Sequence, residues 1–167
     1  MIIRLAEPAD AEGGAALHLA CWREAYAGIV EPQRLAEITG DLDGTVEHWR
    51  AMIAVSRRWL AEENGELVGF AAAGPNDETD LDVTSKLYAI YVRKAYWGTG
   101  LGHRLITQAI GNDDAALWVF RDNGRAVDFY ARQGFVADGR EQVEPEFGAP
   151  EIRMVRRRAQ TTEAILP

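Results

Sequence analysis

Residues 87–110 read LYAIYVRKAYWGTGLGHRLITQAI, and they predict a strand, a glycine-rich turn and a helix in direct succession. The segment 87–92 is aromatic and β-branched enough to form a central strand. From Leu101 to Ile110 the apolar side chains recur at helical spacing, which predicts an amphipathic helix with one buried face. The turn between them carries three glycines, at positions 98, 100 and 102. This order of elements is typical of a site that holds an anion at the start of a helix.

The glycine turn suits a phosphate-bearing ligand. Glycines remove side chains, so successive backbone N–H groups can close around an anion, and the helix N-terminus adds its partial positive charge. The surrounding charge agrees, because in a chain whose net charge is −8 this turn is flanked by four basic side chains: Arg93, Lys94, His103 and Arg104. We therefore expect a polyanionic ligand at this turn.

Other phosphate-binding turns fit the segment less well. A P-loop needs Gly-Lys followed by Ser or Thr, and no such triplet is present here. A dinucleotide-binding turn needs a glycine at the sixth place counted from Gly98, where His103 stands, and it opens its fold, whereas this turn follows several strands. A turn in which the glycines serve only the backbone remains an alternative.

A second informative stretch, residues 118–135, reads WVFRDNGRAVDFYARQGF. Asp122 or Asn123 can cap a helix, and Gly134 can take the left-handed conformation at its other end, with Phe135 packing beyond it. Most of the pattern therefore follows from structure alone. The phenol of Tyr130 does not, because a phenylalanine would serve equally well as a buried aromatic side chain.

The rest of the chain predicts further strands and helices. Before residue 87 we expect a strand over 2–6, a long helix over about 8–28, a short helix over 32–38, a helix around 46–53, and a hairpin of strands 58–62 and 66–73 that turns at Asn64-Gly65. After residue 110 we expect strand 115–120, helix 124–133, a strand from 135 and a last strand over 151–157. The alternation in the second half predicts an α/β (α+β) fold whose mixed sheet is partly parallel.

Together the two stretches resemble the GCN5-related N-acetyltransferase (GNAT) family. The turn resembles that family's Q/R-x-x-G-x-G/A signature, with Trp97 at the Gln/Arg place, and the second stretch resembles its N-x-R-A-x-x-F-Y-x-x-x-G-F motif. The resemblance covers about Leu87 to Val136, and weaker matches at Trp22 to Gly28 and in the last strand extend it. It implies a central mixed sheet of about seven strands flanked by helices, in a single N-acetyltransferase domain over 1–158 with a tail over 159–167.

The same resemblance implies acetyl-CoA as co-substrate and no metal. In that family the turn holds the pyrophosphate through main-chain amides, the thioester carbonyl is polarised near Tyr91 or Val92 where the strand splays from its neighbour, and Asn123 holds the pantetheine arm. The expected cofactor-binding residues are Ile90, Tyr91, Val92, Trp97, Gly98, Thr99, Gly100, Leu101, Gly102, His103 and Asn123. Tyr130 is the expected catalytic acid, since a phenol with a pKa of about 10 stays protonated at neutral pH and can donate toward the departing sulfur.

Direct attack by an amine is the implied mechanism, and it raises the question of a base. An alkylammonium has a pKa of about 10.4, so it must lose a proton first. Four carboxylates are conceivable, and none is assigned: Glu24, Asp77, Asp82 and Glu144. Many relatives carry Glu where Lys86 stands. Trp22 and Tyr26, four apart on the first long helix, could wall the acceptor pocket, although ordinary core packing explains them as well.

Composition excludes several other classes. A chain of 167 residues with a net charge of −8 lacks the broad basic face that nucleic-acid binding usually needs. The longest apolar runs, 67–74 and 115–120, are much shorter than the roughly 20 residues that span a bilayer. The three histidines are dispersed in the sequence, which argues against a zinc site. We expect neither a nucleic-acid partner nor a membrane partner.

Cys21 is the single cysteine, which excludes an internal disulfide and fits a reducing, cytoplasmic location. His18 lies three residues before it on the same predicted helix, so a Cys–His nucleophile is an alternative to plain packing. Residues 1–8 lack the basic and apolar segments of a secretory signal, so secretion is not expected.

Three functions follow from these observations. The first is N-acetyl transfer to the primary amine of a small molecule such as a polyamine, an amino acid or an aminated metabolite. Acetylation of protein N-termini or lysines is an alternative within the same class. The alternative from another class is a catalytically weak coenzyme A-binding regulatory domain. Relatives often form dimers, so a homodimer is also an expectation of the resemblance.

Overall fold

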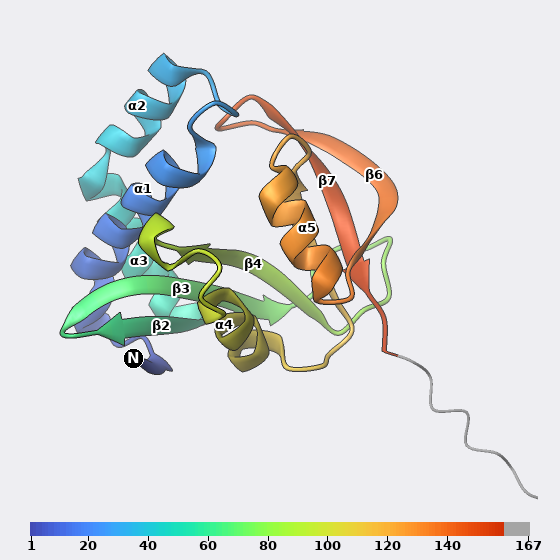
Figure 1. Cartoon of the computed structure of the whole chain (residues 1–167), viewed down its shortest axis with the longest axis horizontal. Coiled ribbons are helices and arrows are strands. Elements are labelled where there is room, and N and C mark those ends of the chain that lie inside the picture. The colour runs from blue at the N-terminus through green and yellow to red at the C-terminus, as the bar shows by residue number, and fades with distance from the viewer. Residues whose placement is uncertain (159–167) are drawn as a thin grey trace, which may run out of the picture.

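The computed structural model describes residues 1–158, and the expected tail over 159–167 lies outside the described residues. Seven strands form one sheet in the order β1-β2-β3-β4-β5-β7-β6 (Figure 1). The strands are β1 (Ile2–Leu5), β2 (Arg57–Glu63), β3 (Glu66–Pro75), β4 (Ser85–Val92), β5 (Ala115–Phe120), β6 (Val136–Glu144) and β7 (Ala149–Arg156). The helices are α1 (Ala11–Tyr26), α2 (Pro32–Gly40), α3 (Leu42–Val55), α4 (Leu101–Ile110) and α5 (Gly124–Arg132), with short 3-10 turns η1 (Pro8–Asp10) and η2 (Lys94–Tyr96).

These bounds follow the expectations closely, and the predicted bounds of α4 and β5 are confirmed to the residue. The predicted hairpin of β2 and β3 turns at Asn64 and Gly65, whose φ values of 53° and 81° are both positive. An Asn-Gly pair adopts this conformation at little cost, because Gly has no Cβ and Asn tolerates the left-handed region. The other predicted elements differ from the observed ones by a few residues at their ends.

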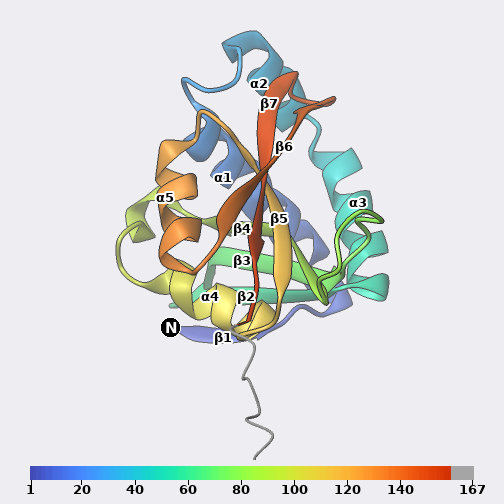
Figure 2. The same cartoon turned by 90° about the vertical axis from the view of Figure 1, so that its right-hand side faces the viewer.

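Helices cover both faces of the sheet. Figure 2 shows α4 and α5 on one side of the strands and α3 on the other. One core lies where α1 and α3 pack on β2 and β3, and another lies where α4 and α5 pack on β5. Gly14 lets α1 approach α3 closely, because a Cβ at that position would lie 2.4 Å from the fully buried ring of Trp49. None of the described helices is long and apolar enough to cross a bilayer.

The sheet opens between β4 and β5. These strands are the one parallel pair of neighbours within residues 1–158, as the alternation of elements predicts. Their pairing consists of Ser85 with Ala115 and Lys86 with Ala116, and it stops there. From Leu87 onward, one edge of β4 therefore has no neighbouring strand. The expected splaying of this strand is present, and the opening positions the site.

Candidate active site

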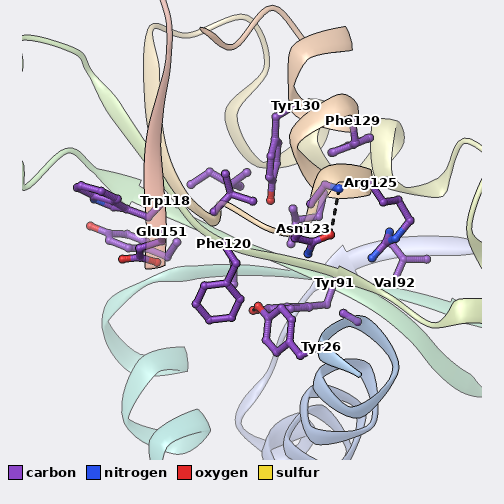
Figure 3. Close-up of a pocket in the computed structure, with 18 of the residues that line it drawn as sticks. Tyr26, Tyr91, Val92, Trp118, Phe120, Asn123, Arg125, Phe129, Tyr130 and Glu151 are labelled. Atoms are coloured by element: carbon purple, nitrogen blue, oxygen red, sulfur yellow. Dashed lines mark hydrogen bonds between the residues drawn. The ribbon is translucent and has the colours of Figure 1, made fainter. Parts of the chain in front are cut away.

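A cavity of about 760 Å³ occupies the opening between β4 and β5 (Figure 3). The glycine turn and the start of α4 line one end of it. The other end is lined by side chains of α1, β5, β6 and β7, among them Tyr26, Phe120 and Glu151. In Figure 3, Arg125 and Val92 lie at one end, Trp118 and Glu151 lie at the other, and Tyr130 lies between them.

The glycine turn places free backbone donors at one end of the cavity. Gly98 and Gly100 have φ values of 76° and 87°, which explains the need for glycine at both positions. The first hydrogen bond along α4 runs from Arg104 N–H to Gly100 O, at 3.1 Å. The three preceding N–H groups, in residues 101–103, have no acceptor within the helix and carry its positive dipole end. The turn can therefore hold an anion through its backbone.

Nine of the predicted cofactor-binding residues line the cavity: Ile90, Tyr91, Val92, Trp97, Gly98, Gly100, Gly102, His103 and Asn123. Thr99 and Leu101 do not. The Thr99 hydroxyl donates to Tyr96 O at 2.7 Å, and the Leu101 side chain is 2% exposed in the core beneath α4. These two residues can therefore offer only backbone N–H donors to a ligand.

The aromatic ring of Trp97 supports an arginine from the opposite helix. Its Nε1 donates to Val92 O at 2.8 Å, which fixes the ring against the end of β4. The guanidinium of Arg125, on α5, lies 3.6 Å from the ring centroid. Burial lowers the pKa of Arg125, and no acidic side chain among residues 1–158 forms an ion pair with it. A cation with no carboxylate partner thus faces the cavity beside the turn.

Arg93 is engaged elsewhere, contrary to the expectation that it supplies charge around the turn. Its guanidinium donates to Glu24 Oε1 on α1 at 2.8 and 3.0 Å, and Lys94 N–H donates to the other carboxylate oxygen of Glu24 at 2.6 Å. These contacts lower the pKa of Glu24 against the opposing effect of its burial. Glu24 therefore anchors α1 to the end of β4 and is not free to act as a base.

The unpaired edge of β4 presents backbone N–H groups to the cavity. Arg93 N–H donates to Val68 O on β3 at 2.9 Å. Because successive N–H groups of a strand point to opposite edges, those of Val92 and Ile90 point toward β5, where pairing has already stopped. Of the two expected carbonyl-polarising positions, Val92 is the one whose N–H faces the opening.

Tyr130 brings its hydroxyl to the middle of the same opening (Figure 3). Its ring is 8% exposed and packs on Phe129 and Phe135, which fixes it on the inner face of α5. Burial, followed by the nearby Tyr91, raises the pKa of Tyr130 well above its ordinary value, so the phenol stays protonated. Within the described residues its hydroxyl forms no hydrogen bond, which leaves it free for a ligand.

Asn123 begins α5 at the edge of the cavity. Its side-chain oxygen accepts a hydrogen bond from Ala126 N–H at 3.2 Å, as expected for a helix cap. The residue is 7% exposed and lines the cavity. Capping uses the oxygen, so the amide N–H₂ group remains for another partner.

The two aromatic residues predicted on the first long helix, Trp22 and Tyr26, both line the cavity. They lie at the end away from the glycine turn, which we call the acceptor end. Both also pack against other aromatic side chains. Tyr26 and Tyr91 share a hydrogen bond of 2.5 Å between their hydroxyls. Burial raises the pKa of both, to about 12 for Tyr91. Trp22 and Tyr26 pack against Phe147, which closes this side of the cavity.

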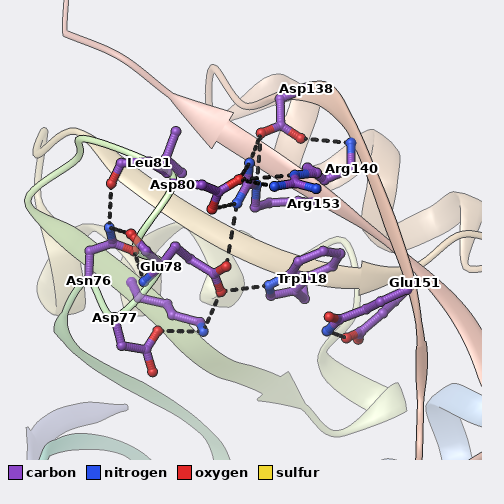
Figure 4. A network of polar contacts seen from close by, with 12 residues as sticks. Asn76, Asp77, Glu78, Asp80, Leu81, Trp118, Asp138, Arg140, Glu151 and Arg153 are labelled. Atoms are coloured by element: carbon purple, nitrogen blue, oxygen red, sulfur yellow. Dashed lines mark hydrogen bonds and ion pairs between the residues drawn. The ribbon is translucent and has the colours of Figure 1, made fainter.

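The acidic loop between β3 and β4 is tied across the strands by an ion-pair network (Figure 4). Glu78 accepts hydrogen bonds from Lys86 at 2.7 Å and from Trp118 Nε1 at 2.9 Å. Arg153, which is 4% exposed, reaches Asp80 at 2.7 Å and Asp138 at 2.7 Å. The network holds this loop over the acceptor end.

A Cys–His nucleophile does not fit the structure. Burial, together with Glu24, raises the pKa of the Cys21 thiol to about 12, so it does not ionise at neutral pH. His18 Nδ1 accepts a hydrogen bond from Trp49 Nε1 at 3.3 Å, and burial lowers the pKa of His18 to about 3. Cys21 therefore has a packing role.

The family is decided by comparison with known proteins. The family described as "Acetyltransferase (GNAT) family" matches residues 19–135, which is more than half of the chain. The chain belongs to the GNAT family.

Relatives of this GNAT chain agree in sequence and in fold. "Probable N-acetyltransferase Rv2775" of Mycobacterium tuberculosis is 30% identical over 152 residues, covering 83% of this chain and 81% of that protein. The PaiA N-acetyltransferase of Thermoplasma acidophilum, solved with coenzyme A, has a TM-score of 0.73 at 18% identity and covers 95% of this chain and 100% of its own. The yncA structure from Salmonella typhimurium, solved with acetyl-CoA, has a TM-score of 0.67 at 22% identity and covers 100% and 97% of the two chains.

The predicted family and fold, a mixed sheet of seven strands flanked by helices, are confirmed, and the chain is an N-acetyltransferase. Arg125 and Glu151 are among the residues of this GNAT site that were not predicted. Arg125 stands inside the N-x-R-A motif, so the motif already contained its signal. Glu151 lies on the same face of β7 as Ala149 and Arg153, and all three are buried. A carboxylate at such an inward-facing position of a strand is the pattern that could have indicated it.

Proposed function

We propose that this enzyme takes acetyl-CoA as its acetyl donor and transfers the acetyl group to the primary amine of a small molecule by direct attack. The glycine turn supports the donor, because it offers backbone N–H groups and a helix N-terminus to a diphosphate. The solved structures with coenzyme A and acetyl-CoA that share this fold are consistent with that choice.

Each part of the cavity has a role in this proposal. The N–H groups of residues 101–103 and the guanidinium of Arg125 hold the diphosphate, and the amide of Asn123 holds the pantetheine arm. The Val92 N–H donates to the thioester carbonyl, where negative charge develops during attack, and a preorganised donor of this kind is worth roughly 10²–10³ in rate. The Tyr130 hydroxyl donates to the sulfur as it departs.

The size of the cavity favours a small acceptor. Its volume of about 760 Å³ must serve both the arm of the donor and the acceptor, and small-molecule sites alone occupy about 300–1,000 Å³. Aromatic rings of Tyr26, Phe120 and Phe147 close the side next to α1, and the Glu78 network holds the loop at the far end.

One observation carries the proposal: the Tyr130 hydroxyl and the Val92 N–H face the same break in the sheet, and the glycine turn lies at the end of that break. A calorimetric titration with acetyl-CoA tests it, with acetyl-pantetheine, which lacks the diphosphate, as the matched control. We expect saturable binding of acetyl-CoA and much weaker binding of the control. No measurable affinity for acetyl-CoA would overturn the proposal.

Acceptor class is tested by release of the free thiol. We expect small primary amines to accelerate thiol release from acetyl-CoA above its background hydrolysis. Release driven by peptides alone would indicate a protein acceptor in place of a small molecule.

A further inference from the structure

Glu151 is a buried carboxylate in the wall of the acceptor end. It lies on β7, opposite Phe120 on β5 and Gln142 on β6, and it is 8% exposed. Gln142 Nε2 donates to one of its oxygens at 2.5 Å. An ionised carboxylate can accept about four hydrogen bonds, and this neutral amide is its single partner within residues 1–158. The second oxygen is left without one, and the residue lines the cavity (Figures 3 and 4).

Apart from Glu146, which is exposed, the other carboxylates near this end already have partners among the described residues. Glu78 is held by Lys86, Trp118 and Arg153, and Asp77 is held by Lys86 at 2.6 Å. Glu144 caps the turn before β7 by accepting a hydrogen bond from Phe147 N–H at 2.7 Å. The one lysine in the cavity wall, Lys86, is thus taken up by two carboxylates. Glu151 is the buried carboxylate that is left without a cationic partner.

The groups around Glu151 do not neutralise the negative charge of its carboxylate. Burial raises the pKa of Glu151, Glu144 and Glu78 add to the rise, and Gln142 and Lys86 oppose it. Glu151 lines the same cavity as Tyr26 and Tyr91, and it helps to raise the pKa of both. The charged and titratable groups that face it are Glu144 from β6, Lys86 and Tyr91 from β4, Glu78 from the loop before β4, and Tyr26 from α1.

We propose that Glu151 binds the ammonium group of the acceptor and takes its proton, and that the acceptor is therefore a cationic amine with no negative group near its reacting nitrogen. The free oxygen of Glu151 opens on the cavity, and an incoming ammonium supplies the cationic partner that the described residues do not. The inference rests on the proposed function, because it assigns a residue and a substrate class to the same site.

The proton balance closes with groups that are present. One proton passes from the ammonium to the Glu151 carboxylate and later to water, which leaves a neutral amine. The nitrogen then forms a bond to the acetyl carbon, and the bond between that carbon and sulfur breaks. Tyr130 gives its proton to the departing sulfur and regains one from the nitrogen, which gives the amide and the free thiol. The net products are the acetylated amine, coenzyme A and one proton.

The charge of the acceptor end selects among small amines. Three glutamates line it without an ion pair among the described residues: Glu144, Glu146 and Glu151. An amino acid would bring its carboxylate close to these three groups, and like charges at short range repel. A diamine or an uncharged alkylamine avoids this repulsion.

The test of the role compares Glu151→Gln with Glu141→Gln. Glutamine keeps the size of the side chain and its hydrogen bond with Gln142. Glu141, on β6, is exposed, lies outside the cavity and gives the same change in net charge. With 1,4-diaminobutane as acceptor, we expect Glu151→Gln to lower kcat/KM about 100-fold at pH 7, a typical effect of losing a general base. Glu141→Gln should stay within about twofold of the unchanged enzyme.

The pH profile separates this role from a structural one. Near pH 10 the solution itself supplies neutral amine, since the amine pKa is about 10.4. The deficit of Glu151→Gln should therefore shrink to about tenfold or less at that pH. A deficit that is equal at pH 7 and pH 10, or no deficit at either, would overturn the role.

Three acceptors that each contain four carbons test the substrate class: 1,4-diaminobutane, n-butylamine and 4-aminobutanoate. They share the reacting end and differ in the charge of the other end. We expect 4-aminobutanoate to have the lowest kcat/KM by at least tenfold, and Glu151→Gln to narrow that difference. If 4-aminobutanoate is the best of the three, the class is wrong.

A binding measurement keeps the inference testable without turnover. In the complex with coenzyme A, the carboxyl carbon of Glu151 can be followed by NMR while pH is varied, with and without 1,4-diaminobutane. We expect the amine to move the midpoint of this titration to lower pH, because a bound ammonium favours the ionised carboxylate. An unmoved midpoint overturns the inference. Loss of acetyl-CoA binding is the separate result that would overturn the proposed function.

Discussion

The hydroxyl of Tyr130 is a single atom whose removal tests the proposed chemistry. A typical intramolecular hydrogen bond adds about 0.5–1.5 kcal/mol to stability, and this hydroxyl, which faces the cavity, forms none among residues 1–158. We predict that Tyr130→Phe lowers kcat about 100-fold or more, since it removes the proton donor, and leaves the Kd of acetyl-CoA within about twofold. Steady-state kinetics and calorimetry check the two quantities. An unchanged kcat would remove the acid role from this residue.

Tyr96→Phe is the matched control for this experiment. The Tyr96 ring also lines the cavity, but its hydroxyl donates to Glu63 on β2 at 2.8 Å and is therefore already engaged. Its removal should change kcat less than twofold. A similar loss in both variants would mean that the effect of Tyr130→Phe comes from packing.

Arg125 illustrates how stacking on an aromatic ring places a charge beside the glycine turn. Its guanidinium lies on Trp97, the residue that replaces the usual Gln or Arg of the signature. We predict that Arg125→Gln weakens acetyl-CoA binding about 10- to 100-fold, which corresponds to one lost hydrogen bond to a charged group. The loss should be smaller at high salt, since screening reduces the contribution of the charge. Calorimetry at two ionic strengths measures both effects.

Arg121→Gln removes the same charge from an exposed position on the preceding turn, where it pairs with Asp122 and Glu141. Binding should be unchanged in this variant. Equal weakening in the two variants would point to the net charge of the protein in place of a local contact.

At the scale of elements, prediction from sequence succeeded where local chemistry decides the structure. The bounds of α4 follow from its apolar spacing and from Gly100 before it, and the β2–β3 turn follows from Asn64-Gly65. These signals are short in range, because side chains that meet lie three or four residues apart or across a tight turn. Both motifs lie on elements of this kind, and the residues they predict mostly line one cavity.

What the sequence could not predict depends on contacts between distant segments. Arg93 was expected beside the glycine turn, but it pairs with Glu24, which is 69 residues away. The position of Arg125 over Trp97 requires α5 to lie beside the start of α4, where Phe129 approaches Gly102. Glu151 becomes part of the site only because β7 lies between β5 and β6. Sequence spacing contains no information about contacts between distant segments, so the positions of these residues could be found only from the structure.

Two glycines at helix starts differ in whether the backbone conformation requires glycine. Gly100 needs it, whereas Gly124 does not. Gly100 has a φ of 87° before α4, whereas Gly124 begins α5 without a positive φ and an added Cβ there meets nothing within 4 Å. We predict that Gly100→Ala lowers the free energy of unfolding by about 1 kcal/mol and that Gly124→Ala raises it by up to about 1 kcal/mol. Urea unfolding of both variants measures the difference. If both shift in the same direction, backbone conformation is not the deciding factor.

At the scale of the whole molecule, the layer of α1 and α3 meets the sheet around one buried imidazole. His18 is 7% exposed, and its ring packs edge-on against Phe70 at 4.8 Å between centroids. Burial, with Arg58 and His48 nearby, lowers the pKa of His18 from 6.5 to about 3. The ring therefore stays neutral in the folded protein over a pH range in which it is charged in the unfolded chain.

The sign of the effect on stability follows from proton binding. Between about pH 6.5 and pH 3 the unfolded chain holds a proton on His18 that the folded protein does not, so acid favours unfolding. Paired carboxylates such as Asp10 and Asp80, whose pKa values are lowered by arginine contacts, add to acid unfolding only near and below their ordinary pKa of 3.8. Glu151, with its raised pKa, acts in the opposite direction. The effect of His18 is therefore best isolated above pH 4.

We predict that His18 lowers the free energy of unfolding by about 1.4 kcal/mol for each pH unit between about pH 6 and pH 4. His18→Gln keeps an acceptor for Trp49 Nε1 and cannot take up a proton, so its stability should lack this slope. Urea unfolding of both proteins across this range gives the comparison, and contributions shared by the two, such as those of His48 and the carboxylates, cancel in the difference. Because the ring lies where α1, α3 and β3 meet, its protonation should act on the unfolding of the whole domain. Parallel slopes would show that His18 is protonated in the folded protein or that the layer opens locally before the domain unfolds.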